Sequence, residues 1–110
     1  MSSAPTGETA SVFAALGDPT RLRLVAVLCA GGAFSIAQLT AGTDISRQGV
    51  TKHLHVLAAA DVAHSTRAGR EIIWQLNPPR LDAARQAIDR ISAQWDQALD
   101  RLREFVETDE

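Results

Sequence analysis

The sequence predicts a mainly α-helical domain that contains a helix-turn-helix and one small β-hairpin. Two helix starts with N-capping residues lie close together, at Ser35 and Ser46. They are followed by a strand-turn-strand pattern and then by one long amphipathic stretch. Because 110 residues with 45% hydrophobic content have room for one core, we place a single domain at residues 9–107. We expect a flexible arm at residues 1–8 and a tail at residues 108–110 to flank it.

The first two helices are predicted at residues 9–16 and 19–30. The first ends at Gly17, and the second starts with Asp18 as its N-cap and Pro19 at the first helical position, where a missing N–H costs nothing. Apolar residues cover most of the surface of the second helix, so we expect it to be the central core helix. The candidate buried residues of the two helices are Val12, Phe13, Leu16, Leu22, Leu24, Val25, Val27 and Leu28.

A helix-turn-helix is predicted at residues 35–57. Ser35 and Gln38 form a capping box, in which a hydroxyl and an amide each satisfy a free backbone group of the helix start. Asp44 is suited to the left-handed conformation of a tight turn, and Ser46 caps the second helix. An ordinary pair of packed helices with a solvated polar face is the alternative interpretation of this pattern.

The second helix of this motif has two different faces. Its apolar residues Val50, Leu54 and Leu57 fall at i, i+4 and i+7. His53 lies beside this apolar stripe, and we expect it to pack and to form hydrogen bonds inside the domain. The opposite face has side chains of the kind that read base edges and phosphates in a major groove. Its candidate DNA-binding residues are Arg47, Gln48, Thr51, Lys52 and His55.

A β-hairpin is predicted from strands at residues 62–67 and 71–76. Gly69 between them supplies the positive φ that a tight turn needs. Arg67 and Arg70 lie at the tip, which suits a hairpin that binds along a phosphate backbone or in a minor groove. The alternative is a solvated hairpin that its charges keep soluble.

A long amphipathic helix is predicted at residues 80–106. Its apolar residues are spaced three and four apart, as in the a/d seam of a coiled coil. A helix of this length cannot bury its whole seam against so small a domain, so we expect part of the seam to pair with the same helix of a second subunit. The alternative is that it packs wholly within one chain. The seam residues are Leu81, Ala84, Ile88, Ile91, Trp95, Ala98, Leu102 and Phe105.

The charges of the chain are unevenly distributed. The net charge is −2, which argues weakly against nucleic-acid binding when it is averaged over the chain. Residues 46–75, however, have four basic residues against two acidic ones, whereas residues 80–110 have five against eight. With no apolar run long enough to span a membrane and no leader-like start, we expect a cytoplasmic protein with no membrane partner.

Together these segments resemble the ArsR/SmtB family of winged helix-turn-helix repressors. The resemblance covers nearly the whole chain and is carried by residues 15–21 (ALGDPTR), by residues 45–48, 50–54 and 56–57 of the second helix, and by residues 67–71 (RAGRE) and 74–76 (WQL). It implies a homodimer held by the first and last helices, with recognition helices in successive major grooves of a roughly palindromic operator, about one turn (~34 Å) apart.

The resemblance also assigns residues by position. The recognition helix would contact DNA through Arg47, Gln48, Thr51 and Lys52, and the wing through Arg67 and Arg70. The expected dimer interface comprises Phe13, Leu81, Ile88, Ile91, Trp95 and Leu102. Two residues depart from the family pattern and predict modest affinity. Gly49 lies inside the recognition helix at a cost of about 1 kcal/mol against Ala, for which a close backbone approach is one explanation, and Asp61 replaces the usual glycine at the helix end.

The usual metal sites of the family are missing from this sequence. Residues 34–39, which match the cysteine cluster of metal-sensing members, contain no thiol, and residues 80–110, which would hold a second zinc site, contain no histidine. We therefore expect no metal and no cofactor, as in the metal-independent branch. Redox-sensing members use two cysteines, and Cys29 has no partner in its chain. We expect it to be a small core residue.

Other classes of function are also open to test. No arrangement of nucleophile, base and orienting group indicates an enzyme. The two alternatives to a DNA-binding repressor are a protein-interaction module and a thiol- or ligand-responsive switch, which would act through Cys29 or a pocket at the dimer interface.

Overall fold

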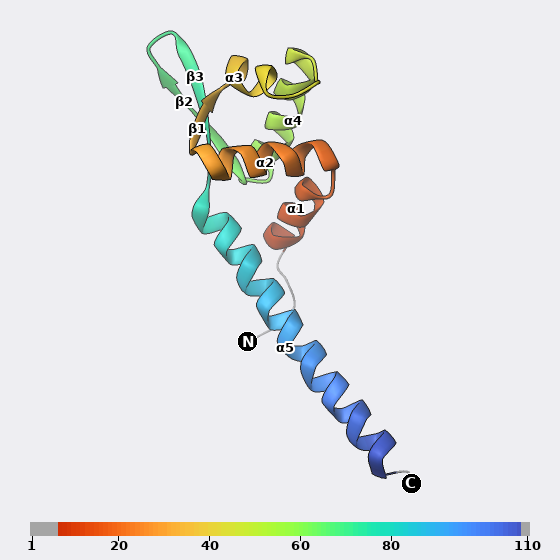
Figure 1. The fold of residues 1–110 in the computed structure, drawn as a ribbon. Coiled ribbons are helices and arrows are strands. Elements are labelled where there is room, and N and C mark those ends of the chain that lie inside the picture. The colour runs from red at the N-terminus through yellow and green to blue at the C-terminus, as the bar shows by residue number, and fades with distance from the viewer. Residues whose placement is uncertain (1–6, 109–110) are drawn as a thin grey trace.

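The computed structural model describes residues 7–108 as five helices and a three-stranded sheet (Figure 1). The predicted arm lies mostly outside the described residues, but Gly7 and Glu8 form the first turn of the first helix, so that helix starts earlier than predicted. Of the predicted tail, Thr108 ends the last helix and residues 109–110 lie outside the described part. The elements are α1 (Gly7–Leu16), α2 (Pro19–Gly31), β1 (Ala33–Ser35), α3 (Ile36–Ala41), α4 (Arg47–Ala59), β2 (Ala63–Ala68), β3 (Glu71–Leu76) and α5 (Pro78–Thr108).

The predicted helix caps are confirmed. The Asp18 carboxylate accepts the backbone N–H groups of Thr20 and Arg21 at 2.9 and 3.0 Å, and both bonds of the Ser35 capping box are present. The Ser46 hydroxyl accepts the backbone N–H of Gly49, in the first turn of α4, at 3.1 Å. The prediction of a left-handed conformation at Asp44 is wrong. Within residues 7–108, the one residue other than glycine with a positive φ is Asp61.

The sheet has the strand order β1-β3-β2 with antiparallel pairing throughout. The β2-β3 hairpin turns at Gly69, whose φ of 65° confirms the predicted turn. β1 was not predicted, because three residues are too few to show a period-two pattern. It pairs with β3 from Ala33 opposite Gln75 to Ser35 opposite Ile73, and so attaches the start of α3 to the base of the hairpin.

α2 is only half buried, contrary to the prediction. Leu24 and Leu28 are buried in the core, whereas Leu22 is 53% and Val27 38% exposed. The reason is that α1, α4 and the sheet all contact one face of this helix. Cys29 is exposed, so its expected place in the core is wrong.

α5 gives the molecule an elongated shape (Figure 1). The radius of gyration is 18.8 Å, against about 13 Å for a compact chain of this length. Only the first third of α5 packs on the domain, through Leu81, Ala84 and Ala87, and every side chain from Ile88 to Glu107 is exposed. The alternative that this helix packs wholly within one chain is therefore wrong. No helix in residues 7–108 is both long and apolar enough to cross a membrane.

Candidate nucleic-acid interface

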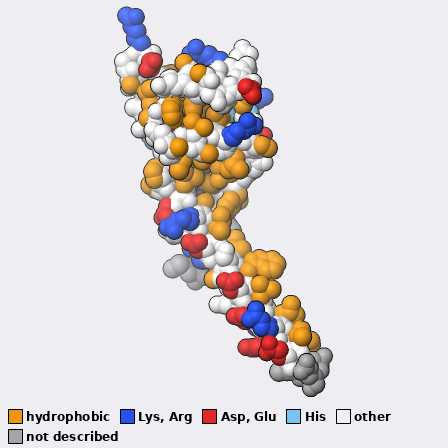
Figure 2. All heavy atoms as spheres, viewed as in Figure 1, with side chains coloured by type: hydrophobic (Ala, Val, Ile, Leu, Met, Phe, Trp, Pro, Cys, Tyr) orange, Lys and Arg blue, Asp and Glu red, His pale blue; other side chains and the backbone are white. Residues whose placement is uncertain are grey.

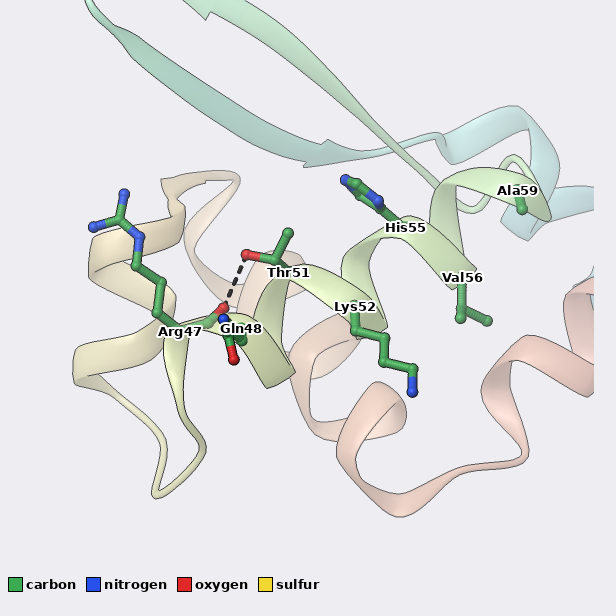
Figure 3. Close-up of a pocket in the computed structure, with 7 residues that line it drawn as sticks. All are labelled: Arg47, Gln48, Thr51, Lys52, His55, Val56 and Ala59. Carbon is green, nitrogen blue, oxygen red and sulfur yellow. Dashed lines mark hydrogen bonds between the residues drawn. The ribbon is translucent and has the colours of Figure 1, made fainter.

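The outward face of α4 forms an open groove (Figure 3). All five candidate DNA-binding residues of this helix line it together, and Thr51 Oγ1 donates a hydrogen bond to the carbonyl oxygen of Arg47 at 2.8 Å. Two apolar residues that sequence reasoning missed, Val56 and Ala59, line its C-terminal end. The sequence contained a signal for them, since residues four and seven positions after Lys52 lie on the same helix face as Lys52.

The position of α4 is fixed from its other face. Val50, Leu54 and Leu57 are fully buried in the core. At Gly49, a Cβ atom would lie 2.6 Å from Cγ2 of Ile45, so the group that approaches this glycine closely is the side chain of Ile45. The helix is therefore held firmly while its polar face stays open, since Arg47, Gln48, Lys52 and His55 are exposed.

His53 faces the body of the protein, as predicted. Its Nδ1 lies 3.4 Å from Nη1 of Arg21 and 3.9 Å from the Asp18 carboxylate, and Nε of Arg21 donates to the carbonyl oxygen of Ala15 at 2.6 Å. The backbone N–H of Arg21 is the main cause that lowers the pKa of the Asp18 carboxyl below its ordinary value of 3.8, with the N–H of Thr20 adding to it. This cluster joins the loop before α2 to the inner side of α4.

His55 connects the recognition helix to the hairpin. Its ring centroid lies 6.2 Å from that of Trp74 on β3, at an interplanar angle of 39°, which is within the range of aromatic packing. Trp74 is 4% exposed, and its indole N–H has no hydrogen-bond partner within residues 7–108. His55 thus combines an exposed position on the groove of α4 with a packing contact that orients α4 against the sheet.

Arg67 and Arg70 lie at the exposed tip of the hairpin. Nε of Arg67 is 3.5 Å from the carbonyl oxygen of Gly69, a long contact. Arg70 lines a small cavity that Arg47 of α4 also lines. The structure thus places the basic residues of the wing and the first residue of the recognition helix on the same side of the domain, and it brings one residue of each to a shared cavity.

Comparison with known proteins identifies the arrangement. Residues 16–68 match a family described as "Helix-turn-helix domain". The chain is 33% identical over 95 residues to the HTH-type transcriptional regulator Rv2034 of Mycobacterium tuberculosis, a match that covers 86% of this chain and 85% of that protein. An ArsR-like transcriptional regulator from Rhodococcus sp. RHA1 superposes with a TM-score of 0.75 at 35% identity, over 89% of this chain and 92% of that one. The chain belongs to the ArsR family.

Membership of the ArsR family confirms three predictions. The fold is a winged helix-turn-helix, in which α3 and α4 form the helix pair and β2-β3 the wing. The protein is a transcriptional regulator and not an enzyme. A transcriptional repressor, SdpR of Bacillus subtilis, is also similar, at 33% identity over 67 residues that cover 61% of this chain and 73% of that protein.

In this ArsR-family chain, an ion-pair cluster fixes the end of the recognition helix. Asp61 has a φ of 61°, and its carboxylate binds Nη2 of Arg80 at 2.9 Å, while Nη1 of Arg80 binds Glu8 at 3.0 Å. Asn77 Nδ2 also donates to the carbonyl oxygen of Asp61. The two bonds of Arg80, with that to Asp61 as the main cause and that to Glu8 second, raise its pKa. An aspartate in place of the usual glycine therefore links α4 to α1 and α5.

The remaining titratable groups do not gather into a metal site in the described part of the chain. Within residues 7–108 no three His, Cys, Asp or Glu side chains lie together in a way that could hold a metal ion. Cys29 and His64 instead line an open, mainly apolar groove between α2, the base of the hairpin and α5, with Leu81 and Arg85 on its far side.

Proposed function

We propose that this ArsR-family chain is a cytoplasmic homodimeric repressor that binds a roughly palindromic operator without a bound metal. The observation that carries the proposal is the open face of α4. Four of its polar residues are exposed, and neither the Arg47 guanidinium nor the Lys52 ammonium group forms a hydrogen bond or ion pair within residues 7–108. Donors left unpaired by the protein are available to base edges and phosphates.

Each element has a role in this proposal. α4 enters the major groove, where Gln48 reads a base edge and Lys52 binds a phosphate. His55 supports the helix from its contact with Trp74. Arg67 and Arg70 of the wing bind the phosphate backbone or the adjacent minor groove. Similarity to the repressor SdpR supports repression as the outcome of binding.

The exposed seam of α5 supports the homodimer. Ile88, Trp95 and Leu102 are 48%, 65% and 58% exposed, and apolar side chains form a stripe along α5 with charges on the opposite side (Figure 2). A contiguous exposed apolar stripe on a single chain is typical of a protein–protein interface. A two-fold dimer would place two α4 helices one helical turn apart on DNA, about 34 Å. The proposed interface residues are Phe13, Leu81, Ile88, Ile91, Trp95 and Leu102.

The test is a fluorescence-anisotropy titration at several salt concentrations. One duplex is the DNA immediately upstream of the chain's own gene, and the control is scrambled DNA of equal length. We expect a preference of about a thousandfold or more for the upstream duplex, which is the range of specific recognition, and no change on adding a metal chelator. Equal binding to both duplexes would contradict this operator. Absence of binding to either would favour a protein-interaction module.

The exposure of Cys29 favours one second candidate, a thiol-responsive repressor. The chain has a single cysteine, so an intramolecular disulfide is excluded and oxidation would have to act through a second molecule or a modified thiol. We expect DNA affinity to be equal under oxidant and reductant, in the wild type and in Cys29→Ser alike. A loss of affinity under oxidant in the wild type that is absent from Cys29→Ser would establish the thiol switch.

A further inference from the structure

A small cavity lies between the recognition helix and the wing. It has a volume of about 190 Å³ and is more enclosed than the groove along α4. Residues 35–37, Arg47 and residues 70–72 line it. The Ser35 hydroxyl already serves as the cap of α3, so the charged groups that face the cavity are Arg47, Arg70 and Glu71.

The two guanidinium groups of this cavity have no partner in the protein. Arg80, Arg85 and Arg103 all form ion pairs, and Arg21 binds a backbone carbonyl oxygen. Arg47 and Arg70 form neither a hydrogen bond nor an ion pair through their guanidinium groups with residues 7–108. Two cations from segments 23 residues apart therefore line one cavity without a partner, and an anion in that cavity could accept hydrogen bonds from both.

The backbones that carry these arginines are fixed. Arg47 is the first residue of α4, directly after the Ser46 cap. Arg70 follows Gly69 in the tight turn of the hairpin, and β1 pairs with β3 and joins the hairpin to the start of α3. The separation of the two arginines is therefore set by the fold, while their long side chains can adjust to a ligand.

The charge of the cavity indicates the kind of anion. Two guanidinium groups and the Glu71 carboxylate leave one net positive charge. That charge balances the single negative charge of a phosphodiester, the group that links nucleotides in DNA, and Arg binds phosphate oxygens with well-directed, charge-assisted hydrogen bonds.

We propose that Arg47 and Arg70 bind one and the same backbone phosphate. This inference rests on the proposed function, in which α4 lies in a major groove and the wing contacts the adjacent minor groove. One backbone strand separates these two grooves, so it must pass between the first residue of α4 and the hairpin. The cavity occupies that place.

The experiment uses the duplex that the wild-type protein binds most tightly, with each phosphate in turn replaced by an uncharged methylphosphonate. Arg47→Gln and Arg70→Gln are each expected to weaken binding to the unmodified duplex by about tenfold, the usual size for a charge-assisted bond. Replacing the shared phosphate should weaken wild-type binding most. It should weaken each single variant less, because one arginine still binds that phosphate, and it should change the affinity of the double variant Arg47→Gln/Arg70→Gln little. Lys52→Gln is the matched control. The phosphate whose replacement no longer weakens binding of this variant should be a different one.

The salt dependence gives a second readout. A plot of log affinity against log salt concentration should lose about 1.8 in slope for the double variant if one phosphate per half-site of the dimer is involved, and about 3.6 if two per half-site are involved. Both substituted residues are exposed, so the thermal unfolding of the variants should match that of the wild type.

The outcomes separate the two proposals. One common phosphate in each half-site, whose replacement has a reduced effect in both single variants and little effect in the double variant, supports the shared phosphate when the loss of slope is the smaller one. Two different phosphates, with the larger loss, overturn it and leave the DNA-binding function intact. If the wild-type protein binds no duplex, both proposals fail.

Discussion

Gly49 shows how a single residue can satisfy a packing requirement at the expense of helix propensity. Glycine inside a helix costs about 1 kcal/mol relative to alanine, but a Cβ at this position would lie 2.6 Å from Cγ2 of Ile45 and 3.3 Å from the Ser46 hydroxyl. That hydroxyl caps α4. The absence of a side chain therefore lets the turn pack closely against the first turn of the recognition helix.

We expect Gly49→Ala not to stabilise the protein. The cost of overpacking, about 1–3 kcal/mol, should match or exceed the gain of about 1 kcal/mol in helix propensity. The free energy of unfolding, measured by urea titration, checks this. In an Ile45→Ala background the clash is removed, so the same substitution should raise stability. A gain of about 1 kcal/mol in the wild-type background would contradict this account of Gly49.

Asp18 gives a prediction about pH. The folded state lowers the pKa of this carboxyl, chiefly through the backbone N–H of Arg21. The charged form therefore stabilises the folded protein at pH values above 3.8, the ordinary pKa of the group. That contribution is lost as the pH falls through the lower pKa of the folded state. Asp18→Asn, which keeps a capping oxygen without the charge, should show a shallower loss of stability in acid than the wild type.

Asp18→Ala is the companion variant for that measurement. It removes both the cap and the charge, so it should be less stable than Asp18→Asn at neutral pH. Denaturant titrations across the acid range would measure both effects. Equal acid dependence of the wild type and Asp18→Asn would show that this carboxylate does not contribute to stability in acid.

At the scale of elements, the recognition helix works as a rigid part with two independent sides. Its inner side is buried through three apolar residues, its start is capped by Ser46 and its end is tied to α5 through Asp61 and Arg80. The outer side therefore projects from a fixed support, a condition for reproducible contacts with base edges.

Two substitutions on this outer side should have different effects. Lys52→Gln should weaken binding to all sequences alike and reduce the salt slope by about two, because it removes the proposed phosphate contact from both half-sites. Gln48→Ala should relax the preference at one base pair of each half-site, at about 1–3 kcal/mol. Anisotropy titrations on a set of single-base operator variants would distinguish them. Arg101→Gln removes the same charge as Lys52→Gln from a distant part of α5 and should change neither property.

At the scale of the whole molecule, the main feature is that most of α5 extends away from the domain, with every side chain from Ile88 to Glu107 exposed in the single chain. The principal extents are 70 × 32 × 20 Å, and the distal part of the helix contributes most of the exposed large apolar residues. Because apolar side chains at a/d spacing gain stability when they pack against a second helix, the exposed distal seam supports the proposed dimer.

We expect Trp95→Glu to separate the subunits. Trp95 is 65% exposed in the single chain, so the substitution leaves the core intact while it introduces a charge into the proposed seam. Sedimentation analysis should show a monomer, and specific DNA affinity should fall with it. Gln97→Glu adds the same charge off the seam and should remain dimeric. A dimeric Trp95→Glu protein would contradict the proposed interface.

The parts of this protein that the sequence determined by itself are those that depend on near neighbours along the chain. Caps at Asp18, Ser35 and Ser46 and the turn at Gly69 each arise within about four residues, and the polar face of α4 follows from helical periodicity. The helix-turn-helix, the wing and the length of α5 were therefore predictable within a few residues. The family resemblance rested on the same local patterns.

The tertiary structure decided what depends on residues distant in sequence. It showed that Cys29, Leu22 and Val27 of α2 are exposed, since only contacts with other elements determine which apolar face is covered. It paired β1 with β3, linked Asp61 to Arg80 and placed Arg47 and Arg70 on one cavity. No local pattern encodes these pairings, because each depends on how the packed core orients segments that are many residues apart.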